Sequence, residues 1–431
     1  MNTLLDIVAR HKRGEQAGVY SLCSAHPRVI ESAMREASAS NAPLLVEATS
    51  NQVNQFGGYT GMTPVDFRRF VLDIAQQVGL REQMLWLGGD HLGPNAWRHE
   101  PADVALAKSA EMIRQYVGAG FRKIHLDCSM ACGGDPEPLP ESIIARRAAR
   151  LCAVAENTWR EVGGEPPVYV IGTEVPVPGG ATESLGELAV TSPDAARATI
   201  QAHQAAFADI GLDTAWSRVI ALVVQPGVEF DHHKVIDYRP NKAQALSAFI
   251  ADDRQFIFEA HSTDYQTAPN LQALVRDHFA ILKVGPGATY ALRETLWGLA
   301  AIAHELPGGA DQEDLRATAI EVMRSDPKYW RSYYHDSERE TLDLQFSLSD
   351  RIRYYWPHPR VKQAYESLLA RLRGVSLPLT LLSQFLPHQY EAVRAGRVQA
   401  EVDALLNEGI ALALRPYMRA CGVSGVMVNG D

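Results

Sequence analysis

Short apolar runs alternate with longer amphipathic segments from residue 17 to about residue 305. Eight such runs occur: GVYSLC, PLLVEAT, QMLWLGG, RKIHLDCS, PVYVIGTE, RVIALVVQ, QFIFEAH and FAILKVG. The segments between them, such as DFRRFVLDIAQQV and AARATIQAHQAAFADIG, carry apolar residues at helical spacing. Runs rich in Val, Ile and Leu are typical of strands buried on both faces, as in a parallel sheet that helices cover. The pattern therefore predicts alternating strands and helices.

This alternation indicates an α/β fold, and two architectures fit it. A (β/α)8 TIM barrel has eight strand–helix units in about 250 residues, and residues 1–305 supply that count and order. A doubly wound open sheet is the alternative. We favour the barrel because polar residues gather after nearly every apolar run, and the C-terminal ends of the strands carry the active site in barrel enzymes.

The pattern changes after residue 306, where LPGGADQED forms a turn-rich link. Residues 306–431 are predominantly helical in pattern and include the aromatic and charged stretch YWRSYYHDSERETLDLQFSLSDRIRYYWPHP. We predict a helical C-terminal cap or oligomerisation region packed against the barrel, and we expect a homo-oligomer.

Charge and composition exclude several classes of partner. The formal net charge of -10 argues against a nucleic-acid surface, because phosphate neutralisation needs a basic face. No apolar stretch approaches the ~20 residues of a membrane span, and MNTLLDIVARHKRGE predicts an amphipathic helix rather than a signal peptide. The five scattered cysteines predict free thiols rather than a disulfide framework. We therefore expect a cytoplasmic protein without nucleic-acid or membrane partners.

Several apolar runs end in residues suited to metal and proton chemistry. These residues are Asp90 and His91, Asp127, Glu174, and His261. Two imidazoles with open coordination positions fit a Lewis-acid zinc site, and a neighbouring carboxylate such as Asp90 would move a proton. Lys123, His125 and Asp127 alternate and therefore share one face of their strand. They fit either a substrate site, with Lys123 and Asp127 as contacts, or a salt-bridged layer inside the barrel.

Two glycine turns predict a site for a phosphorylated substrate. VPGGAT contains Gly179 and Gly180, and KVGPGAT contains Gly285, Gly287 and Thr289. Glycine lets backbone N–H groups approach a ligand closely, and the last two strand loops are the usual phosphate position in barrels. The hydroxyls of Ser262 and Thr263, in AHST, would face the same anion. Neither turn matches the P-loop pattern of nucleotide-binding proteins.

These motifs resemble those of a known family. GGDHLGP resembles the Asp–His signature of class II fructose- and tagatose-bisphosphate aldolases, and KIHLDCSM, GTEVPVPGG, AHST and KVGPGATYALRETL resemble their other site segments. Over nearly its full length, including SLSDRIRYYWPHPRV, the chain is similar to the large, "non-catalytic" subunits of class II D-tagatose-1,6-bisphosphate aldolase. Members are often labelled tagatose 6-phosphate kinases, and some relatives are described as sugar 4-epimerases.

The resemblance implies roles for particular residues. Asp90 matches the proton-transfer acid, His91 and His261 match two zinc ligands, and Glu174 matches a catalytic carboxylate near the metal. The third zinc histidine of the aldolases has no counterpart, because Pro226 occupies its place in VVQPGVEFDHH. Three substitutes stay open, and spacing dictates none of them: Gln225, Glu229 and His232.

The resemblance leaves more than one function open. The first hypothesis is a D-tagatose 6-phosphate 4-epimerase that uses a divalent metal, zinc first, in retro-aldol and aldol steps on a phosphorylated ketohexose. The alternative is a stabilising subunit whose partner is a catalytic class II aldolase chain. Aldolase activity of the chain alone is a third hypothesis. Kinase activity has the least support, since no nucleotide signature is present.

Overall fold

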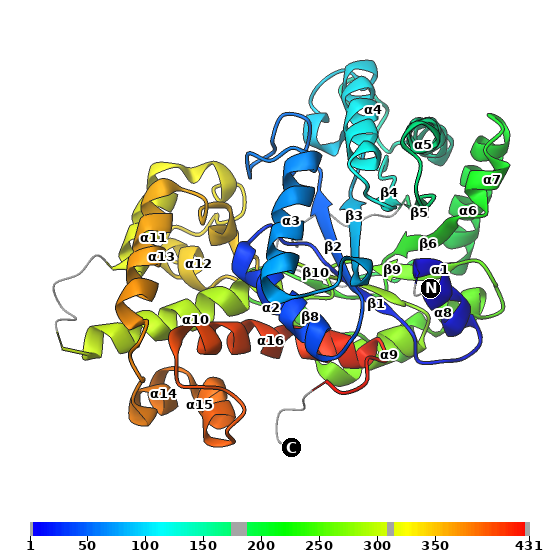
Figure 1. Ribbon diagram of the computed structural model, residues 1–431. Helices are drawn as coiled ribbons and strands as arrows, with labels where there is room; N and C mark the ends of the chain where they lie inside the picture. Colours follow the sequence, from blue (N-terminus) through cyan, green and yellow to red (C-terminus); the bar gives the residue numbers. More distant parts are fainter. Residues whose placement is uncertain (1–2, 174–187, 308–313, 427–431) are drawn as a thin grey trace.

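The computed structural model describes residues 3–173, 188–307 and 314–426. Eight parallel strands form a closed barrel in the order β1-β10-β9-β6-β5-β4-β3-β2 (Figure 1). They are β1 (Val19–Leu22), β2 (Leu44–Thr49), β3 (Leu85–Asp90), β4 (Lys123–His125), β5 (Val168–Ile171), β6 (Val219–Val224), β9 (Ile257–Ala260) and β10 (Ile281–Val284). Each strand comes from one of the eight apolar runs, so the predicted TIM barrel is confirmed.

Helices surround the barrel and follow the amphipathic segments. They are α2 (Pro27–Ala39), α3 (Pro64–Val78), α4 (Ala102–Gly118), α5 (Glu141–Val162), α6 (Pro193–Ala208), α8 (Pro240–Ala251), α9 (Ala268–Arg276) and α10 (Pro286–Glu305), with the short α7 (Asp213–Trp216) before β6. The start of α3 shows why these segments become helices: Thr63 and Asp66 form a capping box, and Pro64 occupies the first turn. Gly79 ends the same helix in the left-handed conformation at φ 73°.

The N-terminal helix α1 (Leu4–Lys12) closes one end of the barrel. Its residues Leu4, Ile7 and Val8 pack in one apolar cluster with inward residues from the beginnings of the strands, such as Val19 and Val168. This apolar cluster lies where the strands begin, and the candidate site residues lie at the other end, where the strands finish. A small antiparallel pair, β7 (Glu229–Phe230) and β8 (Val235–Ile236), follows β6 and was not expected from the sequence.

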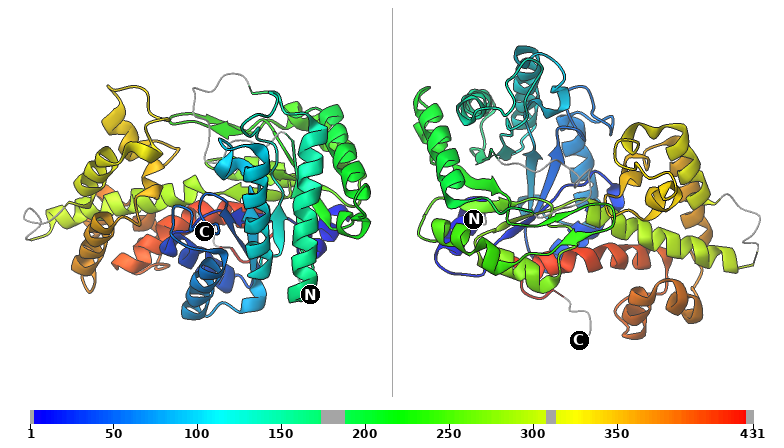
Figure 2. Two further views of the ribbon diagram at one scale, coloured as in Figure 1. Left: turned by 90° about the horizontal axis from the view of Figure 1, so that it is seen from above. Right: turned by 180° about the vertical axis from the view of Figure 1, so that it is seen from behind.

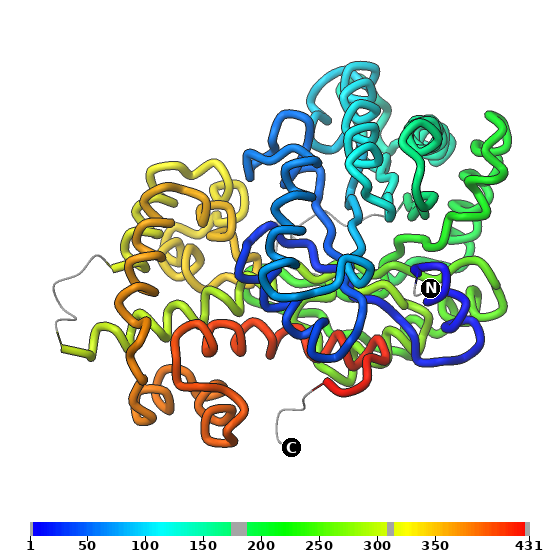
Figure 3. Tube along the Cα trace, viewed as in Figure 1, coloured from blue at the N-terminus to red at the C-terminus, as the bar shows by residue number. Residues whose placement is uncertain are grey.

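The C-terminal region is helical, as predicted. It contains α11 (Leu315–Ser325), α12 (Glu340–Phe346), α13 (Pro359–Leu372), α14 (Leu379–Phe385), α15 (Pro387–Arg394) and α16 (Val402–Ala420). Figure 2 shows α11, α12 and α13 grouped beside the barrel, whereas α16 returns to it. In Figure 3 the red trace of α16 runs along α10, and α16 also contacts α2 and α9.

Buried contacts fix α16 to the barrel. Arg415 forms ion pairs at 2.8 Å with Glu36 of α2 and with Glu408 of its own helix. The Tyr417 hydroxyl donates to the carbonyl of Thr263 at 2.6 Å, just beyond the end of β9. The last long helix therefore supports a loop that carries candidate site residues.

Two features bear on the other sequence expectations. None of the helices in the described residues is both long and apolar enough to cross a membrane. All five cysteines are free thiols, and only Cys23 among them is not fully buried.

We predict that Leu414→Ala in α16 lowers the free energy of unfolding by about 2–5 kcal/mol, because Leu414 is completely buried and its truncation leaves a cavity. Chemical denaturation of the full chain measures this change. The matched control is Leu379→Ala, whose side chain is 44% exposed and whose truncation should change stability by less than about 0.5 kcal/mol. Equal effects of the two variants would show that α16 does not fold cooperatively with the barrel.

Candidate active site

A layer of paired charges crosses the barrel interior. Lys123 on β4 lies 2.8 Å from Glu47 on β2 and 2.5 Å from Glu259 on β9. Lys283 on β10 pairs with the same Glu47 and lies 3.0 Å from Asp90 at the end of β3. All of these side chains are buried, and their pairing offsets the several kcal/mol that each ion loses on leaving water. Of the two interpretations left open for Lys123, the structure shows the salt-bridged interior layer.

The two glycines of LGGDH allow close packing on both sides of β3: Gly88 faces Glu47 of the charged layer, and Gly89 faces Leu92. A Cβ atom at Gly88 would lie 2.4 Å from Glu47 Oε1, and one at Gly89 would lie 2.4 Å from the Leu92 side chain. Glycine is therefore required for the backbone of β3 to pass this closely. The strand can then end with Asp90 directly above the ion pairs.

Three imidazoles meet above the charged layer. The ring centroids of His91, His125 and His261 lie 4.9 to 5.4 Å from one another. Asp90 accepts a hydrogen bond from His125 Nδ1 at 2.9 Å, and Asp127 contacts His91 Nδ1 at 2.7 Å. All five side chains are buried. The structure thus brings together residues from β3, β4 and β9 that lie far apart in the sequence.

The backbone at two of these strand ends is strained. His91 has φ 49° and Ser262, next to His261, has φ 53°. Residues other than glycine seldom adopt this left-handed conformation, at a cost of order 1–3 kcal/mol each, and such residues cluster at functional sites. The positions of the two histidines therefore depend on unusual backbone geometry at both strand ends.

The donor set fits a divalent metal ion. Ligand atoms of Asp90, His125, Glu259 and His261 all lie within 4.8 Å of one another. His125 Nε2 is buried, with no hydrogen-bond partner among the described residues, which is expected of a nitrogen that awaits a ligand. Of the two histidines expected to bind metal, this group of described residues includes His261 and not His91, whose Nδ1 contacts the Asp127 carboxylate at 2.7 Å. Imidazole and carboxylate donors together suit zinc.

The protonation states also suit metal and proton chemistry. Burial lowers the pKa of His261 to about 4, so this imidazole is neutral at neutral pH. Burial alone would raise the pKa of Asp90, but the charges of His91 and Lys283 outweigh it and hold that pKa well below the usual value. Asp90 is therefore an ionised carboxylate, able to bind a metal or accept a proton.

The three substitutes proposed for the missing zinc histidine lie elsewhere. Gln225 Oε1 accepts from the amides of Gly227 and Val228 at 2.8 and 3.0 Å. Glu229 accepts from the amide of Phe230, and His232 Nδ1 contacts the Ser349 hydroxyl of the C-terminal region at 3.0 Å. In the described residues, the group of metal donors around His261 contains none of the three and includes His125 instead.

The sequence did contain a signal for His125. Its place between Lys123 and Asp127 in an alternating strand put it on the inward face. The resemblance directed attention to the segment after the sixth apolar run, where the related aldolases carry their histidine.

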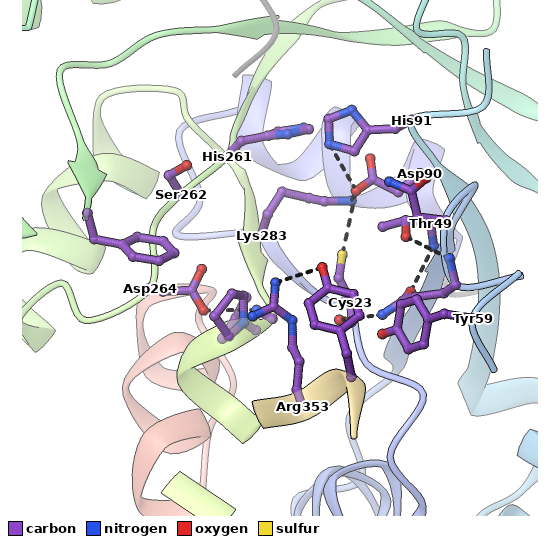
Figure 4. Close-up of a pocket in the computed structure, with 17 residues that line it drawn as sticks. Cys23, Thr49, Tyr59, Asp90, His91, His261, Ser262, Asp264, Lys283 and Arg353 are labelled. Atoms are coloured by element: carbon purple, nitrogen blue, oxygen red, sulfur yellow. Dashed lines mark hydrogen bonds and ion pairs between the residues drawn. The ribbon is translucent and has the colours of Figure 1, made fainter. Parts of the chain in front are cut away.

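A pocket opens beside the imidazole cluster (Figure 4). Its lining comes from the ends of β1, β2, β3, β9 and β10 and from the C-terminal region: Cys23, Thr49, Tyr59, Asp90, His91, His261, Ser262, Asp264, Lys283, Gly285, Arg353 and Tyr354 are among its residues. In Figure 4, Arg353 enters from the side opposite His91 and His261. The barrel mouth is therefore closed in part by a residue from beyond position 306.

The predicted substrate residues have different surroundings. Ser262 and Gly285 line the pocket, and neither Lys123 nor Asp127 does. Thr263 donates to the carbonyl of Lys283, and Thr289 donates to Asp350. The amide of Gly287, with that of Gly285, donates to the Asp264 carboxylate. Glu174, Gly179 and Gly180 lie outside the described residues, so their roles remain predictions.

Comparison with known proteins agrees with the motifs. Residues 4–422 match the family described as D-tagatose-1,6-bisphosphate aldolase subunit GatZ/KbaZ-like. The chain belongs to this GatZ/KbaZ-like family. The family resemblance inferred from the sequence is thus confirmed.

Solved structures resemble this chain to different degrees. A probable tagatose 6 phosphate kinase from Sinorhizobium meliloti 1021 is 50% identical, with a TM-score of 0.87, over 94% of this chain and 100% of that chain. The YdjI aldolase from Escherichia coli K12 matches at 8% identity and a TM-score of 0.41, over 85% of this chain and 95% of that chain. Fructose-bisphosphate aldolase from Campylobacter jejuni matches at 14% identity and a TM-score of 0.41, over 86% of this chain and 91% of that chain.

We predict that His125→Ala lowers the affinity of this GatZ/KbaZ-like protein for Zn²⁺ by more than about 100-fold, since even supporting residues around a metal cost 10–100-fold when lost. Metal titration of the purified protein, followed by calorimetry, measures the affinity without any substrate. His232→Ala is the matched control and should bind Zn²⁺ as the wild type does. A larger loss of Zn²⁺ affinity in His232→Ala than in His125→Ala would instead indicate that the third ligand lies in the segment after β6.

Glu229 gives a pH-dependent prediction. Burial raises its pKa to about 7, above its value in the unfolded chain, so the folded protein favours the protonated form. Its contribution to stability is complete below about pH 4.5 and is lost as the pH rises towards 7. Glu229→Gln should therefore gain on the order of 2–3 kcal/mol relative to wild type between pH 5 and pH 8. Thermal unfolding at both pH values measures the gain, and the exposed Glu338→Gln should show none.

Proposed function

We propose that this protein is a D-tagatose 6-phosphate 4-epimerase, which produces D-fructose 6-phosphate through retro-aldol and aldol steps. The observation that carries the proposal is the contact between the ionised Asp90 and the cluster of His91, His125 and His261 at the mouth of the barrel. Membership of the family supports an aldolase-related function in sugar-phosphate metabolism, and the pocket beside the cluster supplies a place for such a substrate.

Asp90 is ionised and lines the pocket, so it is placed to act as the base. It would remove the proton of the C4 hydroxyl, after which the C3–C4 bond breaks to give an aldehyde, glyceraldehyde 3-phosphate, and a three-carbon enediolate. Rotation of the aldehyde and formation of a new C3–C4 bond invert C4, and Asp90 returns the proton to the new hydroxyl. A divalent metal held by the imidazoles, zinc by its donor set, would supply Lewis-acid stabilisation of negative charge on the substrate.

Epimerisation also requires that both fragments stay bound between the two steps. Arg353 and Tyr354 of the C-terminal region line the same pocket as Asp90 and His91. A wall contributed from outside the barrel strands limits the escape of the aldehyde and the entry of water. The C-terminal region thus supports epimerisation over release of two products.

The second candidate function is that of a stabilising subunit for a separate class II D-tagatose-1,6-bisphosphate aldolase chain. The description of the family as an aldolase subunit favours it. In that case the partner chain carries out catalysis, and the purified protein raises the stability or turnover of that partner without converting tagatose 6-phosphate itself.

We expect the purified protein with Zn²⁺ or Mn²⁺, and without ATP or a partner, to convert tagatose 6-phosphate to fructose 6-phosphate in an NMR assay. Asp90→Asn should lower turnover by about 10²–10⁴-fold because the base is lost. The matched control is Asp194→Asn, whose side chain is 91% exposed, and it should be fully active. If tagatose 6-phosphate stays unconverted and the protein instead raises the turnover of an added class II aldolase chain, the subunit function is supported and the epimerase is rejected.

A further inference from the structure

The pocket has two polar ends, and the proposed chemistry uses only one of them. Asp90, His91 and His261 form the end at the imidazole cluster, and Arg353 lies at the other (Figure 4). Arg353 belongs to a short 3-10 helix, Arg351–Tyr354, in the C-terminal region. A phosphorylated substrate that reaches Asp90 with its reacting carbons needs a partner for its phosphate elsewhere in this pocket.

The glycine turn after β10 is already occupied by an anion of the protein itself. The amides of Gly285 and Gly287 donate to Asp264 Oδ1 at 2.9 and 2.7 Å. Burial raises the pKa of Asp264 to about 6, so at neutral pH the carboxylate is mostly charged. A phosphate at these amides would have to displace Asp264 and would meet a like charge. The turn expected from the sequence to bind phosphate is therefore a poor site for it.

Arg353 has the opposite character. Its guanidinium donates to the carbonyls of Ser349 and Asp350 and to the hydroxyl of Tyr354. The nearby carboxylates have other partners: Asp350 pairs with Arg293 at 3.6 Å, and Asp264 accepts from the two glycine amides. Both act on Arg353 only through longer-range charge. A guanidinium at a pocket wall that forms no direct ion pair there favours the binding of an anion, and its planar fork suits a phosphate.

Aromatic side chains hold Arg353 in position. Its guanidinium carbon lies 4.6 Å from the centre of the Tyr354 ring, and Arg351 packs over the same ring at 4.5 Å and over the Tyr333 ring at 3.7 Å. Tyr354 in turn contacts Tyr59, with ring centres 4.6 Å apart. Tyr59 comes from the loop after β2, so the barrel and the C-terminal region together fix the arginine. A pre-organised donor of this kind loses little entropy when a ligand binds.

We propose that Arg353 binds the phosphate group of the substrate, and that the amides of Gly285 and Gly287 instead anchor Asp264. This assignment rests on the proposed function for the identity of the sugar. It makes the C-terminal region part of the substrate site, with the reacting carbons at the imidazole cluster and the phosphate at the 3-10 helix.

The test is binding of tagatose 6-phosphate to the full-length, metal-loaded protein, measured by calorimetry so that turnover is not needed. Arg353→Gln should weaken binding by about 10–100-fold, as expected for loss of a hydrogen-bonded ion pair. Its Zn²⁺ content and its weak binding of unphosphorylated tagatose should stay at wild-type values. Arg331→Gln, at an exposed arginine in the same region, is the matched control and should bind as the wild type does.

Arg353→Lys keeps the positive charge but lacks the paired N–H donors of the guanidinium, so it should weaken binding of tagatose 6-phosphate several-fold. This variant tests the proposal if Arg353→Gln does not fold. Wild-type affinity in either folded Arg353 variant would overturn the proposal. So would an Asp264→Asn variant that binds tagatose 6-phosphate much more tightly and independently of Arg353, because the phosphate would then lie in the glycine turn. Binding that depends on Arg353 without conversion of the sugar would sustain this inference while rejecting the epimerase.

Discussion

The ion pairs that cross the barrel interior are the interaction on which the site depends. Lys123 lies between Glu47 and Glu259, and Lys283 joins Glu47 to Asp90. Removing one partner of such a buried pair costs about 3–5 kcal/mol, since it leaves the other charge alone in a dry interior. The layer therefore fixes both the position of Asp90 and its ionised state. The geometry of any reaction at the mouth of the barrel therefore depends on Glu47, Lys123, Glu259 and Lys283, which hold Asp90 in place.

The site is completed by parts of the chain that an isolated barrel would lack. Helix α16 packs along α10 and against α2 and α9, and its Tyr417 supports the loop that holds Ser262 and Asp264. The 3-10 helix of the C-terminal region supplies Arg353 and Tyr354 to the pocket wall. Both contributions come from beyond residue 306, so the C-terminal region has a part in the site as well as in the core.

The arrangement of metal donors also separates this chain from the pattern suggested by its motifs. In the described residues, the group of possible metal donors around His261 includes His125 of β4, whereas Gln225 after β6 accepts from the amides of its own turn. Burial of three imidazoles and an ionised carboxylate is costly, and groups of this kind cluster at functional sites.

The sequence by itself determined the eight strands, the helices between them and the placement of Asp90, His91 and His261 at strand ends, because burial on both faces and helical spacing are local patterns that survive in any tertiary setting. It could not decide whether Lys123 meets substrate or an ion pair, since that depends on which strands lie opposite one another across the barrel. Nor could it show that His125 joins the imidazoles, that Asp264 fills the glycine turn, or that Arg353 reaches the pocket. Each of these contacts joins residues from separate elements, and only closure of the barrel and docking of the C-terminal region bring them within bonding distance.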